Sequence, residues 1–132
     1  MTKKTVKDMV TVANSVVEVL SPEQALEQQA NGSAIIIDIR DIRELWREGK
    51  VDGASHVPRG MLEFWFDSES PYHKDWLADE TKKYVLHCAS GWRSALSAKT
   101  LQDMGFDNIT HVDKGFGGLK EAGAKIEEVT QD

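Results

Sequence analysis

The chain has 132 residues, of which 40% are hydrophobic and 29% are charged, and its 22 Asp and Glu outnumber its 16 Lys and Arg. This length suits one domain with a sizeable core, and the net charge of −6 argues against binding nucleic acid or an anionic membrane. No stretch has the roughly 20 apolar residues of a membrane helix, and the N-terminus lacks the apolar segment of a signal peptide, so we expect a cytoplasmic protein.

The first third of the chain is predicted to alternate helices and strands. Apolar residues at helical spacing over 3–14 predict an amphipathic N-terminal helix, and the β-branched run at 16–20 predicts a short strand. A helix over 21–30 follows, since Ser21 is a good N-cap and Gln24 completes a capping box with it.

The most apolar strand is predicted at 34–39, where a continuous apolar run implies burial on both faces, as in a parallel sheet. A short helix over 43–48 and an extended segment over 53–58 come next. The aromatic-rich stretch 60–78 is expected to form a short helix, a turn and another helical piece.

The rest of the chain continues the alternation, and strands that alternate with helices at this spacing predict a three-layer α/β domain with a mostly parallel sheet and helices on both faces. The predicted elements are a strand (84–88), a turn (89–92), a helix (93–104), a strand (108–112) and a helix (115–122). The acidic tail 126–132 is expected to fray.

Cys88 is the single cysteine, which excludes an intrachain disulfide, a CxxC pair and a multi-cysteine zinc site. The four histidines, His56, His73, His87 and His111, show no metal-ligand spacing, so we expect no metal site and no cofactor. Cys88 is therefore either a small buried hydrophobe or a nucleophile.

The neighbours of Cys88 favour a nucleophile. Cys88 ends a predicted buried strand just before a helix, where backbone N–H groups and the helix N-terminus stabilise a thiolate. Ser90 adds a hydroxyl donor, Gly91 allows an unusual backbone angle, and Arg93 adds a positive charge. Strand alternation points His87 to the opposite face, so it is not expected to activate the thiol.

Three separated motifs give the chain a resemblance to rhodanese-family sulfurtransferases. The loop C-A-S-G-W-R-S resembles the family's active-site loop, and the upstream block I-I-D-I-R-D-I-R-E-L-W-R-E-G-K-V-D-G-A-S-H-V-P is similar to D-x-R-x-x-x-E…G-H-I-x-G-A-x-x-x-P. The downstream segment G-F-D-N-I-T-H-V-D-K-G-F-G-G carries the double glycine. Lys50 stands where the family often has His, and Leu119 where Trp is common, and we expect both to affect packing.

The resemblance implies a rhodanese-like domain over 16–125, with an N-terminal helical extension at 1–15 and the acidic tail at 126–132. It also implies that Cys88 takes the outer sulfur of thiosulfate or a persulfide donor, becomes a persulfide, and passes the sulfur to a thiol or cyanide. The partners are then small molecules, although a protein could also donate or accept the sulfur. The substrate would bind in the loop formed by Ala89, Ser90, Gly91, Trp92, Arg93 and Ser94.

Further residues are expected to support the site. By resemblance, Asp38 lies close to the loop and holds its geometry through hydrogen bonds, while Arg40 and Glu44 form an ion pair or a helix cap. Arg59 either reaches the crevice, where its charge would help to bind thiosulfate, or is a solvated surface residue. Trp92 is expected at the mouth of the pocket.

Three other functions remain open. A sulfur carrier loaded by a partner enzyme would use the same chemistry, whereas a non-catalytic rhodanese-like binding module would usually lose the cysteine. Tyrosine phosphatases and Cdc25-like phosphatases use a C-x5-R loop, in which Arg is the sixth residue after Cys. Here that position holds Ser94, and Arg93 is the fifth, so the shorter spacing favours sulfur chemistry over phosphate.

Overall fold

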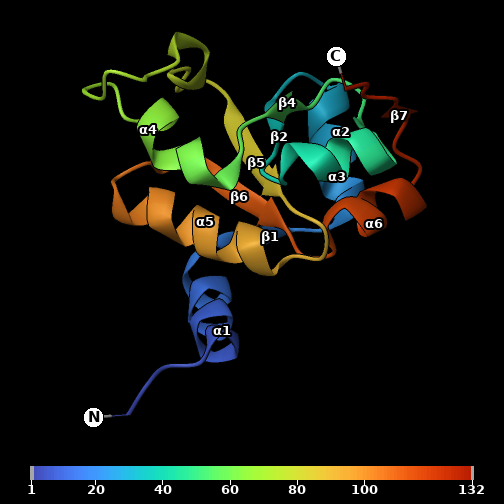
Figure 1. Ribbon diagram of the computed structural model, residues 1–132. Helices are drawn as coiled ribbons and strands as arrows, with labels where there is room; N and C mark the ends of the chain where they lie inside the picture. Colours follow the sequence, from blue (N-terminus) through green and yellow to red (C-terminus); the bar gives the residue numbers. More distant parts are fainter. Residues whose placement is uncertain (1, 132) are drawn as a thin grey trace.

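The computed structural model describes residues 2–131, and a five-stranded sheet lies at their centre (Figure 1). Its strands, in the order in which they pair, are β1 (Glu18–Leu20), β6 (Ile109–Val112), β5 (Lys83–His87), β2 (Ala34–Asp38) and β4 (Ser55–His56). All four pairings are parallel. The carboxyl ends of the strands therefore meet at one edge of the sheet, where α/β proteins place their ligands.

Helices cover both faces of this sheet, which confirms the predicted three-layer α/β architecture (Figure 1). On one face α5 (Trp92–Asp103) and α4 (Leu62–Phe66) pack on alternate side chains of the strands. On the other face the apolar core is completed by α2 (Pro22–Ala30) and α6 (Gly115–Glu121), with α3 (Ile42–Glu48) beside them. Two short 3-10 helices, Arg59–Met61 and Asp75–Leu77, flank α4, as expected for an irregular helical stretch.

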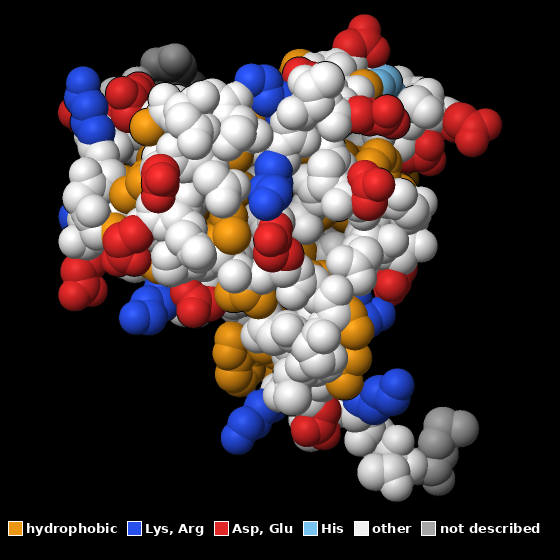
Figure 2. Space-filling view, turned by 180° about the vertical axis from the view of Figure 1, so that it is seen from behind, with side chains coloured by type: hydrophobic (Ala, Val, Ile, Leu, Met, Phe, Trp, Pro, Cys, Tyr) orange, Lys and Arg blue, Asp and Glu red, His pale blue; other side chains and the backbone are white. Residues whose placement is uncertain are grey.

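Helix α1 (Val6–Val16) extends two residues beyond its predicted end, so the following strand begins at Glu18 rather than at residue 16. It packs on α5, with Val10 and Ala13 buried against that helix. Figure 2 shows α1 standing out from the body of the molecule, with hydrophobic side chains along it. Among residues 2–131, no helix combines the length and apolarity needed to cross a bilayer.

The expectation that the chain frays from residue 126 onward is wrong for the start of this tail. Residues Ile126–Glu127 form β7, which pairs antiparallel with β3 (Lys50–Val51). Lys50 forms an ion pair with Glu127 and donates to the carbonyl of Ala54 at 2.8 Å. A two-residue strand is too short to show a sequence pattern, and its pairing depends on a segment some 75 residues away. Met1 and Asp132, which belong to the predicted extension and tail, lie outside the described residues.

Of the two departures from the family pattern, Leu119 serves packing, as expected, whereas the contacts of Lys50 are polar. Lys50 holds the β3–β7 pair together through the contacts described above. Leu119 is fully buried in the core between α6 and the sheet.

We expect Leu101→Ala to lower the free energy of unfolding by about 2–5 kcal/mol, because it removes a fully buried side chain from the α5 face of the core. Urea unfolding measures the change. Met104→Ala is the matched control beside the same helix, since Met104 is 42% exposed and its loss should cost less than about 0.5 kcal/mol. Equal losses in the two variants would contradict this assignment of the core.

Candidate active site

Cys88 lies directly after β5, at the edge of the sheet where the carboxyl ends of the strands meet. The residue is 1% exposed, whereas the next two residues, Ala89 and Ser90, are exposed. The chain then enters α5 through Gly91. The predicted turn between strand and helix is thus present, with its thiol on the inside and its tip in solvent.

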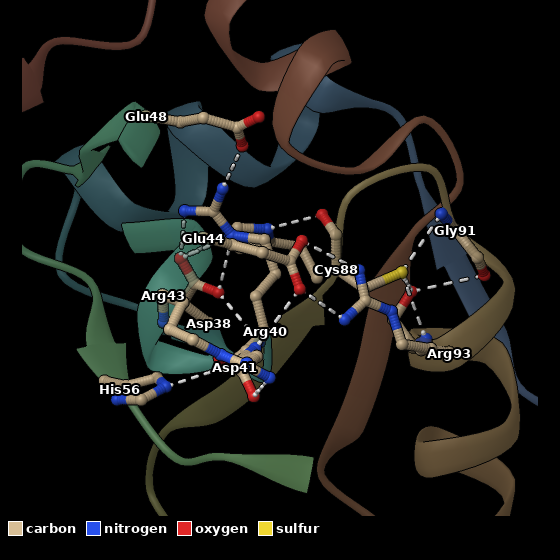
Figure 3. Close-up of polar contacts among 12 residues, drawn as sticks. Asp38, Arg40, Asp41, Arg43, Glu44, Glu48, His56, Cys88, Gly91 and Arg93 are labelled. Carbon is tan, nitrogen blue, oxygen red and sulfur yellow. Dashed lines mark hydrogen bonds and ion pairs between the residues drawn. The ribbon is translucent and has the colours of Figure 1, made fainter. Parts of the chain in front are cut away.

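The sulfur of Cys88 faces the N-terminus of α5 (Figure 3). The backbone N–H of Gly91 donates to Sγ at 3.1 Å, and that of Ser94 does so at 3.4 Å. The Ser94 hydroxyl oxygen lies 3.6 Å from Sγ. Backbone donors in the first turn of a helix favour a negative charge, so this cradle stabilises an anionic sulfur.

Two glycines allow the segment after β6 to lie against this loop. Gly91 has φ +114°, which confirms the predicted unusual backbone angle, and a Cβ there would lie 2.3 Å from the carbonyl oxygen of Asp113. Gly115 has φ +57°, and a Cβ there would lie 2.5 Å from Ala89 backbone atoms. The N–H of Phe116 also donates to the Cys88 carbonyl at 2.8 Å. Sequence reasoning found the need for Gly91 but missed the contact made by Gly115.

Arg93 lies at the start of α5, but its charge has a partner. Its guanidinium donates to both carboxylate oxygens of Glu44 in α3, at 2.8 and 3.0 Å (Figure 3). The hydrogen bonds from Arg93 hold the pKa of Glu44 below its usual range despite partial burial, and Glu44 in turn raises the pKa of Arg93. The positive charge that the sequence predicted for the crevice is therefore offset by a carboxylate.

Of the two predicted roles of Arg40 and Glu44, the ion pair between them is wrong, whereas the helix cap is confirmed for Glu44, whose carboxylate accepts from the N–H of Asp41 at the start of α3. Arg40 instead forms a bidentate ion pair with Asp38, and both side chains are fully buried (Figure 3). Its remaining donors reach Glu48 at 3.0 Å and the carbonyl of Gly49 at 2.8 Å. The helix spacing of residues 40 and 44 was misleading, because α3 begins only at Ile42 and Arg40 lies in the connection between β2 and α3.

Asp38 approaches the Cys88 loop from the face of the sheet opposite to the thiol. Burial alone would raise the pKa of Asp38, but the hydrogen bonds and charge of Arg40 outweigh it and hold that pKa below its usual range. Its contact toward the loop runs through His87, whose Nε2 lies 3.5 Å from the carboxylate. No hydrogen bond joins Asp38 directly to loop residues 89–94 within the described chain, so its predicted support of the loop is indirect.

His87 is fully buried and points away from the thiol, as strand alternation predicted. Its Nδ1 donates to the carbonyl oxygen of Cys88 at 3.0 Å, and its ring stacks near that of Phe116. Burial lowers the pKa of His87, although the charge of Asp38 acts in the opposite direction. The imidazole of His87 therefore supports the loop backbone from the face opposite to the thiol.

Two further predicted residues lie at the margin of the site. Trp92 opens α5 and is 49% exposed, beside the loop tip. The guanidinium of Arg59 is bound by Glu63 at 2.7 Å, and Arg59 borders a groove that it shares with α1 and α5. The positions of Trp92 at the pocket mouth and of Arg59 as a donor-binding cation stay predictions.

A cleft of about 510 Å³ lies between α3 and α6, directly beside the loop. It brings the cations Arg47 and Lys120 next to Ala89, the residue after Cys88. The full lining is Arg47, Glu48, Ala89, Phe116, Gly117 and Lys120. Sequence reasoning did not anticipate this cleft, because its two cations lie on helices that only the fold brings together.

Two side chains that the sequence analysis did not assign to the site lie behind Ser94. The Ser94 hydroxyl oxygen is 3.0 Å from Nδ1 of His111, and Nε2 of His111 is 2.7 Å from the amide oxygen of Asn14. These residues come from α5, β6 and α1. No local pattern links positions this far apart in the chain, so no sequence signal could have found them.

Comparison with known protein families gives one match that covers most of the chain. Residues 21–122 match the model of the rhodanese-like domain. The sequence is also 31% identical, over 105 residues, to a thiosulfate sulfurtransferase GlpE of Shewanella oneidensis; the match covers 80% of this chain and 94% of that protein.

Two solved structures share the fold of this chain, but their descriptions name different functions. A protein of unknown function from Rhodopseudomonas palustris, described as a possible tyrosine phosphatase, is 44% identical with a TM-score of 0.88, and covers 96% of this chain and 97% of its own. The polysulfide-sulfur transferase homodimer of Wolinella succinogenes is 31% identical with a TM-score of 0.70, covering 95% and 88%.

We expect Gly91→Ala to lower the free energy of unfolding by more than the backbone strain of a positive φ alone, because a Cβ at residue 91 also clashes with Asp113. Gly105→Ala is the matched control, because Gly105 has φ +105° but open space around it, so its cost of about 1–2 kcal/mol reflects backbone strain only. The clash with Asp113 should cost Gly91→Ala about 1–3 kcal/mol more. Alkylation of Cys88 by iodoacetamide should slow in Gly91→Ala and not in Gly105→Ala, and equal effects would refute the role of this close approach.

Replacing Asp38 measures how much its buried ion pair with Arg40 contributes to the free energy of unfolding. Asp38→Asn leaves the buried Arg40 without its carboxylate, so we expect a loss of about 3–5 kcal/mol in the free energy of unfolding at pH 7. The pKa of Asp38 is lowered in the folded state. The wild type is therefore more stable than Asp38→Asn at pH values above the unfolded-state pKa of about 3.9, and this difference in the free energy of unfolding disappears as the pH falls through the folded-state pKa.

Urea unfolding of both proteins between pH 2 and 7 measures this convergence. Asp41→Asn serves as the control, since Asn can still cap α3 and the ion pair of Asp41 with Arg43 is solvent-exposed. If the free energies of unfolding of wild type and Asp38→Asn differed by the same amount at every pH, the stabilising role of the Asp38 charge would be refuted.

Proposed function

Because the chain belongs to the rhodanese-like family, we propose that it is a sulfurtransferase in which Cys88 carries a sulfane sulfur from thiosulfate or a persulfide donor to a thiol or cyanide acceptor. The observation that supports this most directly is the cradle around Sγ, in which the N–H groups of Gly91 and Ser94 converge on one sulfur. Every sulfur species in the proposed cycle is anionic, so the same donors serve each step.

In the first half-reaction, the Cys88 thiolate attacks the outer sulfur of thiosulfate. A bond forms between Sγ and that sulfur, the sulfur–sulfur bond of thiosulfate breaks, and sulfite leaves with the electron pair. The product is a Cys88 persulfide with its negative charge on the outer sulfur. The total charge of −3 is the same before and after the step, and no oxidant or reductant is needed.

In the second half-reaction, cyanide or a thiolate attacks the outer sulfur of the persulfide. The bond to Sγ breaks and the Cys88 thiolate leaves, which restores the starting enzyme. Since Cys88 is the only cysteine, no internal thiol can resolve the persulfide, and the acceptor must come from outside. This double displacement is the covalent catalysis expected of a cysteine nucleophile.

The burial of Cys88 favours a small donor. With the residue 1% exposed, a compact anion such as thiosulfate can approach Sγ more readily than a bulky one. Once formed, the persulfide places its outer sulfur farther from the strand, where a larger acceptor can reach it. The cations Arg47 and Lys120 in the adjacent cleft would attract an anionic donor or acceptor to the loop.

A phosphatase is the second candidate, favoured by the likeness to the Rhodopseudomonas palustris protein described as a possible tyrosine phosphatase. Two features of this chain argue against it. Arg93 is the fifth residue after Cys88 rather than the sixth, and its guanidinium is bound by Glu44 instead of being free to bind phosphate oxygens.

We expect the protein to form thiocyanate from thiosulfate and cyanide, and Cys88→Ala to abolish this activity because no other cysteine can carry the sulfur. Mass spectrometry after incubation with thiosulfate alone should show the mass of one added sulfur, removable by dithiothreitol. Met104→Ala, at the exposed far end of α5 and outside the loop, is the control that leaves Sγ and its donors intact.

The same preparations assayed with para-nitrophenyl phosphate separate the candidates. Phosphatase turnover that depends on Cys88, without thiocyanate formation, would overturn the proposal in favour of the second candidate. A folded protein with a reactive thiol but neither activity would indicate a sulfur carrier that requires a protein donor, or a binding module.

A further inference from the structure

A chain of polar contacts runs from the sulfur of Cys88 to the surface on the N-terminal helix. It passes from Sγ to the hydroxyl of Ser94 at 3.6 Å, then to Nδ1 of His111 at 3.0 Å, and from Nε2 of His111 to the amide oxygen of Asn14 at 2.7 Å. Ser94 and His111 are fully buried, whereas Asn14 is exposed. Nothing in the reaction described above uses His111 or Asn14.

The amide of Asn14 determines which nitrogen of His111 carries hydrogen. With the amide oxygen facing the ring, Nε2 must be the donor, so Nδ1 of the neutral imidazole is an acceptor. The Ser94 hydroxyl has two acceptors in reach, the carbonyl oxygen of Gly91 at 3.3 Å and Nδ1 of His111 at 3.0 Å. Donation to the nearer one, Nδ1, leaves the Ser94 oxygen to accept from the thiol of Cys88. Cys88, Ser94 and His111 thus each donate to the next group in the direction of Asn14, which is the arrangement of a proton relay.

We propose that Asn14, His111 and Ser94 form a relay that takes the proton from the Cys88 thiol when the sulfur becomes a nucleophile. The proton of the thiol passes to the Ser94 oxygen while the Ser94 proton passes to Nδ1 of His111. The products are a Cys88 thiolate, an unchanged Ser94 hydroxyl and a His111 imidazolium, whose Nε2–H remains bound to Asn14. This inference rests on the proposed role of Cys88 as a nucleophile.

The relay also reorients the hydrogen bond at the sulfur. After the transfer, Nδ1 of His111 is a donor to the Ser94 oxygen, so the Ser94 hydroxyl can point its hydrogen at the anionic sulfur. This adds a third donor to the two backbone N–H groups of the cradle. His111 and Asn14 touch neither sulfur nor substrate, so they are positioning residues that act through Ser94.

The charged groups around the relay are few. The sheet neighbours of His111 are Val19 in β1 and Leu86 in β5, neither of which is titratable. Asp113 follows β6, α5 contributes Ser94 together with Arg93 in its ion pair with Glu44, and α1 contributes Asn14. Burial lowers the pKa of His111, while the backbone of Val112 and the charge of Asp113 act against this effect. Burial thus makes a charged His111 ring costly unless an opposite charge forms close to it.

Substitutions of Asn14 test the relay without disturbing the core, because His111 is fully buried and its own replacement could prevent folding. Asn14→Asp keeps an oxygen acceptor for Nε2–H and adds a negative charge that favours the imidazolium. Asn14→Ala removes the acceptor. The rate of Cys88 alkylation by iodoacetamide, followed by mass spectrometry between pH 5 and 9, reports the reactive thiolate at a single site.

At pH 6 we expect Asn14→Asp to accelerate alkylation by about threefold to tenfold, with the pH profile shifted toward lower pH, and Asn14→Ala to slow it. In a Ser94→Ala background, where the relay is interrupted, both substitutions should leave the rate unchanged. A carboxylate acting through space would instead disfavour the thiolate, so it would slow alkylation in both backgrounds.

Unchanged profiles in the Asn14 variants would overturn the relay, and so would equal effects with and without the Ser94 hydroxyl. The 15N resonances of the His111 ring provide a direct check, since the relay requires hydrogen on Nε2 at neutral pH. Alkylation does not depend on sulfur transfer. A protein that shows the predicted alkylation profiles but forms no thiocyanate would therefore support the relay and contradict the proposed function. A protein that forms thiocyanate but whose alkylation profiles do not respond to the Asn14 substitutions would support the proposed function and contradict the relay.

Discussion

The close approach of two backbone segments shapes the whole of the candidate active site. The loop after β5 and the segment after β6 lie so near each other that neither Gly91 nor Gly115 has space for a Cβ. This contact holds the Cys88 carbonyl on the N–H of Phe116 and leaves the sulfur facing the first turn of α5. Because the sulfur cradle consists of backbone N–H donors, its ability to stabilise an anionic sulfur depends on the exact position of that backbone.

The buried pair of Asp38 and Arg40 supports this placement from the opposite face of the sheet. It joins the end of β2 to Gly49, just after α3, and the Arg40 guanidinium lies 4.0 Å from the ring centre of Phe116. Burying two charges is costly, and their attraction repays this cost only when the geometry is good and further hydrogen bonds satisfy the remaining polar groups. All three guanidinium nitrogens of Arg40 donate, to Asp38, Glu48 and Gly49, so the pair connects the elements around the loop.

The electrostatics of the site depend more on geometry than on the number of charged residues. Arg93 follows the cysteine closely in sequence, but Glu44 offsets its charge, so the backbone N–H groups of the α5 N-terminus provide the main stabilisation of an anionic sulfur. The cations that line the adjacent cleft, Arg47 and Lys120, come from α3 and α6. An anion thus meets positive charge beside the loop and backbone donors within it.

The sequence by itself determined the layered α/β class, the position of Cys88 at the end of a buried strand, and the need for glycine at residue 91. These follow from local periodicity and from short motifs, which depend on neighbouring residues and therefore survive without knowledge of the fold. Only the tertiary structure decided the partners of Arg40 and Arg93, the pairing of β7 with β3, and the contact of Asn14 and His111 with Ser94. Those contacts join residues on separate elements, and the packing of these elements around the sheet decides which residues meet. The spacing of residues along the chain carries no signal for such pairings.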